Sequence, residues 1–289
     1  MNYWENANHA WTKDSKRVIN TPSNKTKSLF NYIQEIGHFK AYQPYYTERA
    51  NLPSYLMKLT LSGTGHLNYK GQDYILDQGD IFFIDCQHYQ HYKTISDIPW
   101  EMDWIHVYGG ITSQLYEEYN KDGNPVFHTN ALPEENTIHH LVQTLIKDQS
   151  KANARTDFHS SVKIHELLNE LIIQKYHLDF SIDDIPQYIL ELKEYLDSHF
   201  HNVITLNDLE HLFHLNKYQI NKDFSKYIGL PPIDYLITKK VSHAKDLLRY
   251  TDLSIQEISL NIGIDNFAYF SRLFKNKTGM TPSFFRKEG

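Results

Sequence analysis

A short stretch of the sequence, WEMDWIHVY at residues 100–108, groups side chains that could bind a carbohydrate. In a β-strand the side chains alternate between two faces. One face of this stretch then carries Trp100, Met102, Trp104, His106 and Tyr108. Aromatic rings pack well against the C–H faces of a sugar, whose hydroxyls need convergent polar groups. The same stripe is also compatible with an ordinary hydrophobic core, so both interpretations stay open.

Histidine is abundant, with 17 residues in the chain, and imidazole is a natural ligand of iron, zinc or nickel. A metal-dependent enzyme is therefore a competing hypothesis. The spacing of His88 and His91 is odd, however, so on a strand their imidazoles point to opposite faces. We find no serine-hydrolase, P-loop or dinucleotide motif, and Cys86 has no basic sequence neighbour to activate its thiol. We expect no enzymatic activity, no cofactor and no metal.

A second stretch, FAYFSRLFKNKTGMTPSFFR at residues 267–286, mixes aromatic and basic residues. Phe270 and Phe274 are one helical turn apart and predict a buried stripe. Arg272 and Lys275 fall on another side of the same helix, where they could bind DNA or simply face solvent.

The region around this stretch is an internal repeat. TLNDL at residues 205–209 matches SIQEI at residues 254–258 with an offset of 49, and later matches have an offset of 50. Each copy predicts a short helix with a capping box, a turn, and a second capped helix. The expected caps are Thr205 with Asp208, Ser254 with Glu257, and then Asn216 and Asp265, and the expected turns lie at His214 and Gly263. Two short helices joined this way form a helix-turn-helix unit, whose second helix fits the major groove of DNA.

These motifs resemble a known family. IQEISLNIGIDNFAYFSRLFKNKTGMTPSFFR is similar to the C-terminal signature of the AraC/XylS family of transcription regulators, and TLNDLEHLFHLNKYQINKDFSKYIG resembles its first helix-turn-helix unit. The resemblance implies a connecting helix, expected at residues 239–250, and two reading helices in successive major grooves of double-stranded DNA. The residues that match DNA-contacting positions, with one neighbour, are Tyr218, Gln219, Asn221, Lys222, Phe267, Ala268, Arg272 and Lys275. Glu210 and Asp223 depart from the family pattern, which predicts weak DNA binding by the first unit.

The segment YLMKLTLSGTGHLNYKGQDYILDQGDIFFIDCQHYQHY is similar to the cupin-type effector domain in the sugar-responsive branch of the same family. Arg49, Tyr92 and Trp104 match positions that bind the sugar in arabinose-sensing relatives. With Met102 and His106 from the aromatic strand face, they form the expected effector site.

The change of hydrophobic period along the chain predicts an α+β protein. We expect a mobile arm at residues 1–30, an antiparallel cupin-like β-barrel at 31–133, a helical dimerisation segment at 134–177, a linker at 178–186 and an all-α domain with two helix-turn-helix units at 187–289. The pattern of the helical segment is equally compatible with helices that only cover the barrel, and both roles can coexist. The net charge is −6, but residues 187–289 hold 13 Lys and Arg against 12 Asp and Glu, so the acidic excess lies in the first part. The lone Cys86 and the lack of a signal peptide or apolar span favour a cytoplasmic protein.

We therefore predict a sequence-specific transcription regulator, an activator of carbohydrate-utilisation genes that binds a mono- or oligosaccharide in its barrel. The expected partners are an operator with direct half-sites, a second copy of the chain and RNA polymerase, and no membrane. The alternatives are a regulator that senses a non-sugar effector or none, and a metal-dependent cupin enzyme.

Overall fold

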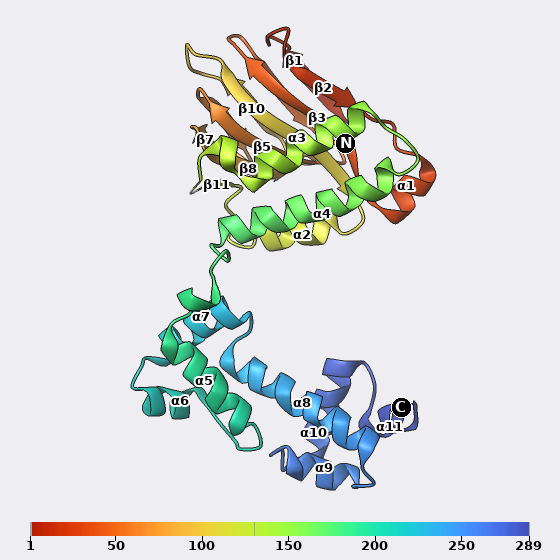
Figure 1. Ribbon diagram of the computed structural model, residues 1–289, viewed down its shortest axis with the longest axis vertical. Coiled ribbons are helices and arrows are strands. Elements are labelled where there is room, and N and C mark those ends of the chain that lie inside the picture. Colours follow the sequence, from red (N-terminus) through yellow and green to blue (C-terminus); the bar gives the residue numbers. More distant parts are fainter. Residues whose placement is uncertain (1, 130, 289) are drawn as a thin grey trace. The chain divides into compact units, whose positions relative to one another are not determined.

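The computed structural model describes residues 2–129 and 131–288. The chain divides into two compact units, one covering residues 1–179 and the other residues 180–289 (Figure 1). The first contains two antiparallel sheets with helices, and the second is helical, which confirms the predicted α+β class.

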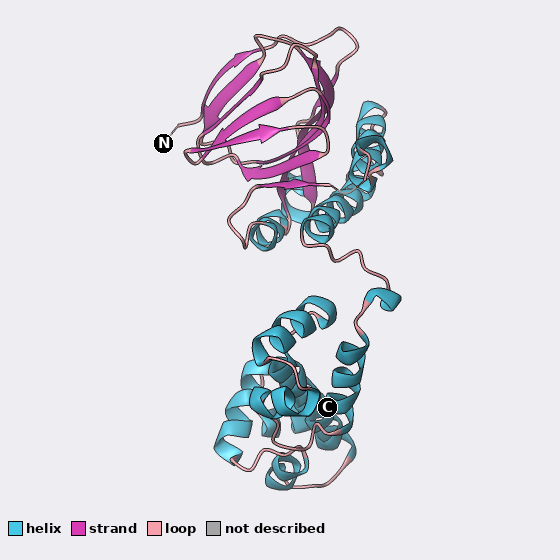
Figure 2. Cartoon of the chain, turned by 90° about the vertical axis from the view of Figure 1, so that its left-hand side faces the viewer, coloured by secondary structure: helices cyan, strands magenta, loops and turns pink. Residues whose placement is uncertain are grey.

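The two sheets of the N-terminal unit face each other across a hydrophobic core (Figure 2). The five-stranded sheet has the order β1 (Trp4–Asn8), β4 (Tyr46–Ala50), β9 (Gln90–Thr94), β6 (Gly65–Tyr69) and β7 (Gln72–Leu76). The six-stranded sheet has the order β11 (Val126–His128), β8 (Asp80–Asp85), β5 (Tyr55–Ser62), β10 (Trp100–Gly109), β3 (Asn31–Ala41) and β2 (Lys16–Ile19). All neighbouring strands pair antiparallel.

Strand β5 is buried on both faces because the six-stranded sheet is covered on its outer side. Met57 and Leu59 pack with the helices, whereas Leu56 points into the core between the sheets. The covering elements are α1 (Asn24–Leu29), α2 (Thr112–Tyr119), the 3₁₀ turn η1 (Pro133–Glu135), α3 (Thr137–Ser150) and α4 (Thr156–Lys175). Helices α3 and α4 carry most of this second core, and α2 is a helix that the sequence pattern does not predict.

The buried face of α4 differs from the predicted one. The helical spacing of Val162, Leu168 and Leu171 in the sequence predicts that they share a buried stripe, but Val162 is 68% exposed. Ile164 and Leu167 lie against the sheet instead, together with the predicted Leu168 and Leu171. The periodic pattern fits both faces because apolar residues occur all around this helix, and only packing against β3 and α3 selects one of them.

The N-terminal segment is part of the sheets, which corrects the expectation of a mobile arm. Strand β1 pairs with β4 so that Glu5 lies opposite Arg49. Strand β2 pairs with β3 and adds to the other sheet. These strands escape sequence analysis because their residues are mostly polar and exposed, as is common for edge strands.

The C-terminal unit contains the expected repeat of helical pairs. Its elements are the 3₁₀ turn η2 (Ile182–Asp184) and the helices α5 (Gln187–Ser198), α6 (Leu206–Phe213), α7 (Lys217–Ile228), α8 (Pro232–Tyr250), α9 (Ile255–Asn261), α10 (Phe267–Thr278) and α11 (Pro282–Glu288). Two separate cores form, one around Ile220 and Phe224 and the other around Phe270 and Phe274. The connecting helix α8 contributes to both cores and begins at Pro232, earlier than the expected residue 239.

The caps and turns of both units agree with the sequence except at one position. Both capping boxes form, and His214 and Gly263 adopt the left-handed conformation at the turns. The cap of α10 is Asn266, not the predicted Asp265. Since Asn216 caps α7, the extra residue of the second copy must lie in the turn before Asn266.

Candidate functional site

A cavity of about 580 Å³ opens between the two sheets and reaches the N-terminal segment. Its volume lies in the usual range for small-molecule sites. The aromatic residues that line it are Tyr3, Trp11, Tyr32, Phe39, Tyr45, Tyr92, Trp104 and Tyr108. The charged residues and histidines that line it are Glu5, His9, Arg17, Lys27, Glu35, Arg49, Lys58 and His106. Trp104, His106 and Tyr108 of the predicted strand face line this cavity, whereas Trp100 and Met102 are buried in the core and do not.

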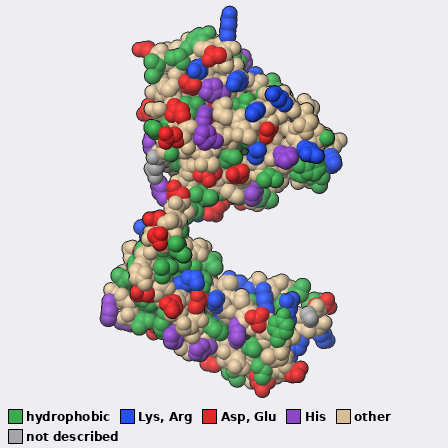
Figure 3. Space-filling model, in the orientation of Figure 1, with side chains coloured by type: hydrophobic (Ala, Val, Ile, Leu, Met, Phe, Trp, Pro, Cys, Tyr) green, Lys and Arg blue, Asp and Glu red, His purple; other side chains and the backbone are tan. Residues whose placement is uncertain are grey.

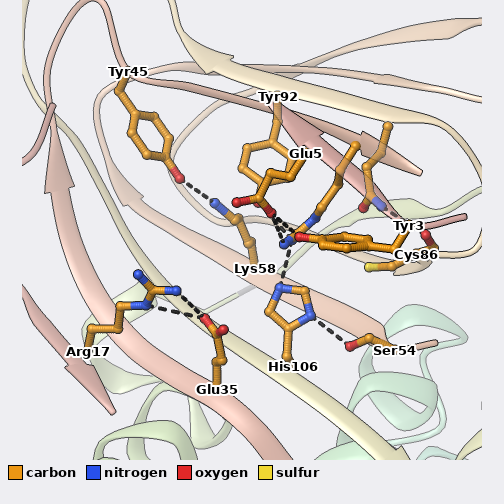
Figure 4. A network of polar contacts seen from close by, with 12 residues as sticks. Tyr3, Glu5, Arg17, Glu35, Tyr45, Ser54, Lys58, Cys86, Tyr92 and His106 are labelled. Carbon is orange, nitrogen blue, oxygen red and sulfur yellow. Dashed lines mark hydrogen bonds and ion pairs between the residues drawn. The ribbon is translucent and has the colours of Figure 1, made fainter. Parts of the chain in front are cut away.

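Arg49 organises the polar end of the cavity. Its Nη2 lies 2.9 Å from the hydroxyl of Tyr92 and 2.7 Å from Nε2 of His106, and its Nη1 lies 3.2 Å from a Glu5 carboxylate oxygen. The predicted residues Arg49, Tyr92 and His106 are therefore brought together. Figure 4 shows Tyr92 and His106 in this network, with Glu5 nearby. Glu5 was missed by sequence analysis, because only the pairing of β1 with β4 places it here.

His106 is held as a neutral imidazole. Burial, followed by the positive charges of Arg49 and Lys58, lowers its pKa well below the ordinary value. Nε2 accepts a hydrogen bond from the Arg49 guanidinium, so the proton is on Nδ1 and points to the Ser54 hydroxyl at 2.7 Å. His106 thus orients Arg49 and is not free to bind a metal.

Lys58 is a cavity residue that the sequence analysis did not single out. It lies on β5, is 2% exposed, and its amine is 3.1 Å from the Tyr45 hydroxyl and 3.3 Å from Sδ of Met102 (Figure 4). The same nitrogen lies 3.9 Å from the centre of the Tyr92 ring, a cation–π distance. Burial and the nearby Arg49 lower the pKa of Lys58 well below its ordinary value. A lysine in the middle of the apolar run YLMKLTL is the signal that could have found it.

Trp104 forms one apolar wall of the cavity. Its ring packs edge-on against Phe39 at 4.9 Å, and Phe39 in turn stacks on Trp11 at 4.4 Å. Gly37 lies beneath it, where a Cβ would approach the Trp104 ring to 2.7 Å. The indole Nε1 is buried without a hydrogen-bond partner, so a donor is left in the wall of the cavity.

The residues considered as metal ligands or nucleophiles are dispersed. Among the described residues, no group of three or more His, Cys, Asp or Glu side chains is arranged to hold a metal ion. Cys86 is buried, and burial raises the pKa of its thiol to about 11. In the part of the chain that the structure describes, no helix is both long and apolar enough to cross a membrane.

The first helix-turn-helix unit presents α7 with a partly polar face. Tyr218 is 76% exposed, Gln219 and Lys222 are exposed, and Asn221 is half-buried. A surface groove of about 470 Å³ lies beside this helix and is lined by Tyr218, Asn221 and Lys222 among others. These positions are accessible to DNA, and their contacts with bases stay predictions.

Glu210 and Asp223, the two residues that depart from the family pattern, both accept hydrogen bonds from nearby groups. Glu210 accepts a hydrogen bond of 3.2 Å from the backbone N–H of Lys217, so its charge lies at the N-terminus of α7, where an anion is favourable. Asp223 accepts hydrogen bonds from Tyr188 and from Gln219. Gln219 is thus engaged within its own helix, which reduces its freedom to contact a base.

The second unit presents α10 in the same way. Phe270 and Phe274 are fully buried, while Phe267, Ala268, Arg272 and Lys275 are exposed. On the visible face of the helical unit, Lys and Arg side chains lie among hydrophobic and acidic ones (Figure 3). Arg286 instead donates hydrogen bonds to the backbone carbonyls of Leu248 and Leu253, so it holds the end of the unit against α8 and the segment that follows it.

Comparison with known proteins gives a consistent result. The model of the AraC-like ligand binding domain matches residues 32–172, and a helix-turn-helix domain model matches residues 209–288. The chain is 25% identical to the Msm operon regulatory protein of Streptococcus mutans, with 81% of this chain and 84% of that protein covered. It is 22% identical to the lactose operon transcription activator of Staphylococcus xylosus (80% and 83% covered) and 24% identical to the arabinose operon regulatory protein of Salmonella typhimurium (81% and 84% covered). On the two matched domains together, the chain belongs to the AraC family of DNA-binding transcription regulators.

Proposed function

We propose that this regulator responds to a mono- or oligosaccharide bound between its two sheets and activates carbohydrate-utilisation genes. The observation that carries the proposal is the cavity of about 580 Å³, with the Trp104 ring on one wall and the Arg49 donors at one end. An indole face suits the C–H side of a sugar ring, and a guanidinium fork suits its hydroxyls. Relatives named for lactose and arabinose operons support a sugar as the effector class.

The N-terminal strand offers a way to transmit binding. Tyr3 and Glu5 line the cavity, and Glu5 contacts Arg49 directly. A sugar that takes hydrogen bonds from Arg49 changes this contact and so shifts the balance between two arrangements of β1. DNA occupancy follows if the two arrangements differ in their affinity for the operator.

Dimerisation is proposed through the outer face of α4. Phe158 is 52% exposed and Val162 is 68% exposed, and the two are one helical turn apart. A second copy of the chain would cover this apolar face. The dimer would present its reading helices to an operator with direct half-sites. At the operator it would also contact RNA polymerase.

The test is a titration of the full-length protein with a panel of neutral and acidic sugars, followed by intrinsic tryptophan fluorescence. Trp104→Phe should reduce the saturable change that a bound sugar produces. Trp4→Phe is the matched control, because Trp4 lies on β1 beside Tyr89 and does not line the cavity. A sugar response that survives Trp104→Phe but disappears in Trp4→Phe would contradict the proposed site.

A further inference from the structure

The charges of the cavity do not balance. Arg17 pairs with Glu35 at 2.8 Å and Arg49 pairs with Glu5 at 3.2 Å. Lys27 also lines the cavity but is exposed to solvent at its rim. Lys58 is buried and, among the described residues, makes no ion pair with a carboxylate. The most buried basic side chain of the cavity therefore has no counter-charge from the protein.

The environment of Lys58 compensates its charge only in part. The Lys58 amine donates a hydrogen bond to the Tyr45 hydroxyl and a weaker one to the sulfur of Met102. It also lies over the π face of the Tyr92 ring. A lysine amine has three donors and prefers an anion when it is removed from water. The lowered pKa of Lys58 agrees with this lack of a negative partner, because burial and Arg49 both disfavour its charged form.

The unpartnered donors around the cavity point the same way. Nε of Arg49 and Nε1 of Trp104 are both buried without an acceptor. Against these, Oε1 of Gln34 is an acceptor in the lining that lacks a donor. A ligand that complements this set needs an acceptor facing the donors and at least one hydroxyl that donates to Gln34.

The geometry points to an effector that carries a carboxylate bound at Lys58, which under the proposed sugar-sensing function makes it a sugar acid. The carboxylate supplies the missing counter-charge, and the hydroxyls of the ring supply donors for Gln34. We assign a carboxylate and not a phosphate because Lys58 sits among the rings of Tyr45, Tyr92 and Trp100, and offers a single ammonium group. A phosphate dianion would need more cationic and backbone hydrogen-bond donors than Lys58 and these aromatic rings provide.

The experiment is isothermal titration of full-length protein with matched ligands. D-glucuronate and D-galacturonate are compared with D-glucose and D-galactose, with the corresponding 6-phosphates, and with cyclohexanecarboxylate as an acid without hydroxyls. Lys58→Met keeps the length of the side chain and removes the amine. It should weaken acid binding by about 10- to 100-fold, the usual effect of a charge-assisted hydrogen bond.

Two controls keep the result interpretable. Lys93→Met removes a positive charge from an exposed position on β9, next to Tyr92 in sequence, and should leave binding unchanged. Thermal unfolding shows whether Lys58→Met folds, and we expect a raised melting temperature without ligand because a buried amine is replaced by an apolar side chain. A folded Lys58→Met that retains full acid affinity would overturn the inference.

The remaining outcomes separate this inference from the proposed function. Equal affinity for a neutral sugar and its acid would overturn the assignment of a carboxylate to the effector but not the proposed sugar response. If cyclohexanecarboxylate alone binds and its binding depends on Lys58, the result would support a carboxylate at Lys58 and overturn a sugar as the effector. Binding of the 6-phosphates alone would overturn the carboxylate, and no binding by any ligand would overturn both.

Discussion

Lys240 of the connecting helix donates a hydrogen bond of 3.0 Å to the backbone carbonyl of Gly263, in the turn of the second helix-turn-helix unit. The same amine donates to the carbonyls of Ile262 at 2.7 Å and Asn202 at 3.1 Å. Asn202 lies before the first unit, so one buried lysine joins both halves of the DNA-binding domain. We expect this contact to restrict the movement of the two helix-turn-helix units relative to one another.

Replacement of Lys240 by Met should therefore uncouple the two units. Three carbonyls lose a charged donor, and we expect a loss of about 1–3 kcal/mol in the free energy of unfolding. Affinity for an operator with two half-sites should fall more than affinity for a single half-site. Thermal unfolding and gel-shift titrations measure both, and Lys245→Met on the same helix is the control, because Lys245 has no role in this contact.

Gly263 is a second test of the same junction. It has a φ of +69°, and a Cβ added there would lie 1.7 Å from the carbonyl oxygen of His201. Gly229 has a φ of +87° at the end of α7, but a Cβ added there meets no atom within 4 Å. Gly229→Ala should cost about 1–2 kcal/mol from backbone strain alone. Gly263→Ala should cost clearly more in urea unfolding, and equal losses would contradict the close approach.

Arg272 should contribute to DNA binding without affecting the effector cavity. It is exposed on α10, opposite the buried Phe270 and Phe274. Arg272→Ala is expected to weaken operator binding by about 1–3 kcal/mol if the guanidinium reads a base, with relaxed specificity at one position. Lys277→Ala on the same helix serves as the control. A parallel loss of effector binding in Arg272→Ala would contradict the division of labour between the two domains.

The helical domain could be predicted almost completely from the sequence, because its signals are local. Capping boxes at Thr205 and Ser254, and the paired phenylalanines of α10, act within a few residues of one another. The cap at Asn266 was missed by one position because the insertion falls in the turn, where Asp265 is an equally good capping residue by type.

The barrel site could be predicted only in part, because its key contacts are non-local. Arg49, Trp104 and His106 were identified by strand alternation and by resemblance, and they do line one cavity. Glu5 reaches Arg49 through the pairing of two strands far apart in sequence, which no local pattern encodes. Lys58 was missed because it is a single charged residue within a mostly apolar strand.

The docking of α3 on the six-stranded sheet should depend on pH. Asp103 is fully buried and accepts hydrogen bonds from His139 at 2.6 Å, His38 at 2.9 Å and Gln143 at 2.8 Å. The hydrogen bond to Asp103 raises the pKa of His139 above its ordinary value of 6.5, against the opposing effect of partial burial, with smaller help from Glu134 and Glu101.

The raised pKa of His139 sets the direction in which stability changes with pH. The contribution of protonated His139 to stability is fully present below pH 6.5, its unfolded value, and is lost as the pH rises through the higher folded value. His139→Gln keeps a donor but not the charge, so it should lower the melting temperature of the N-terminal domain more at pH 6 than at pH 8. His140→Gln is the control, because the neighbouring ring does not contact Asp103. A His139→Gln effect that is constant with pH would show that its charge does not hold α3 in place.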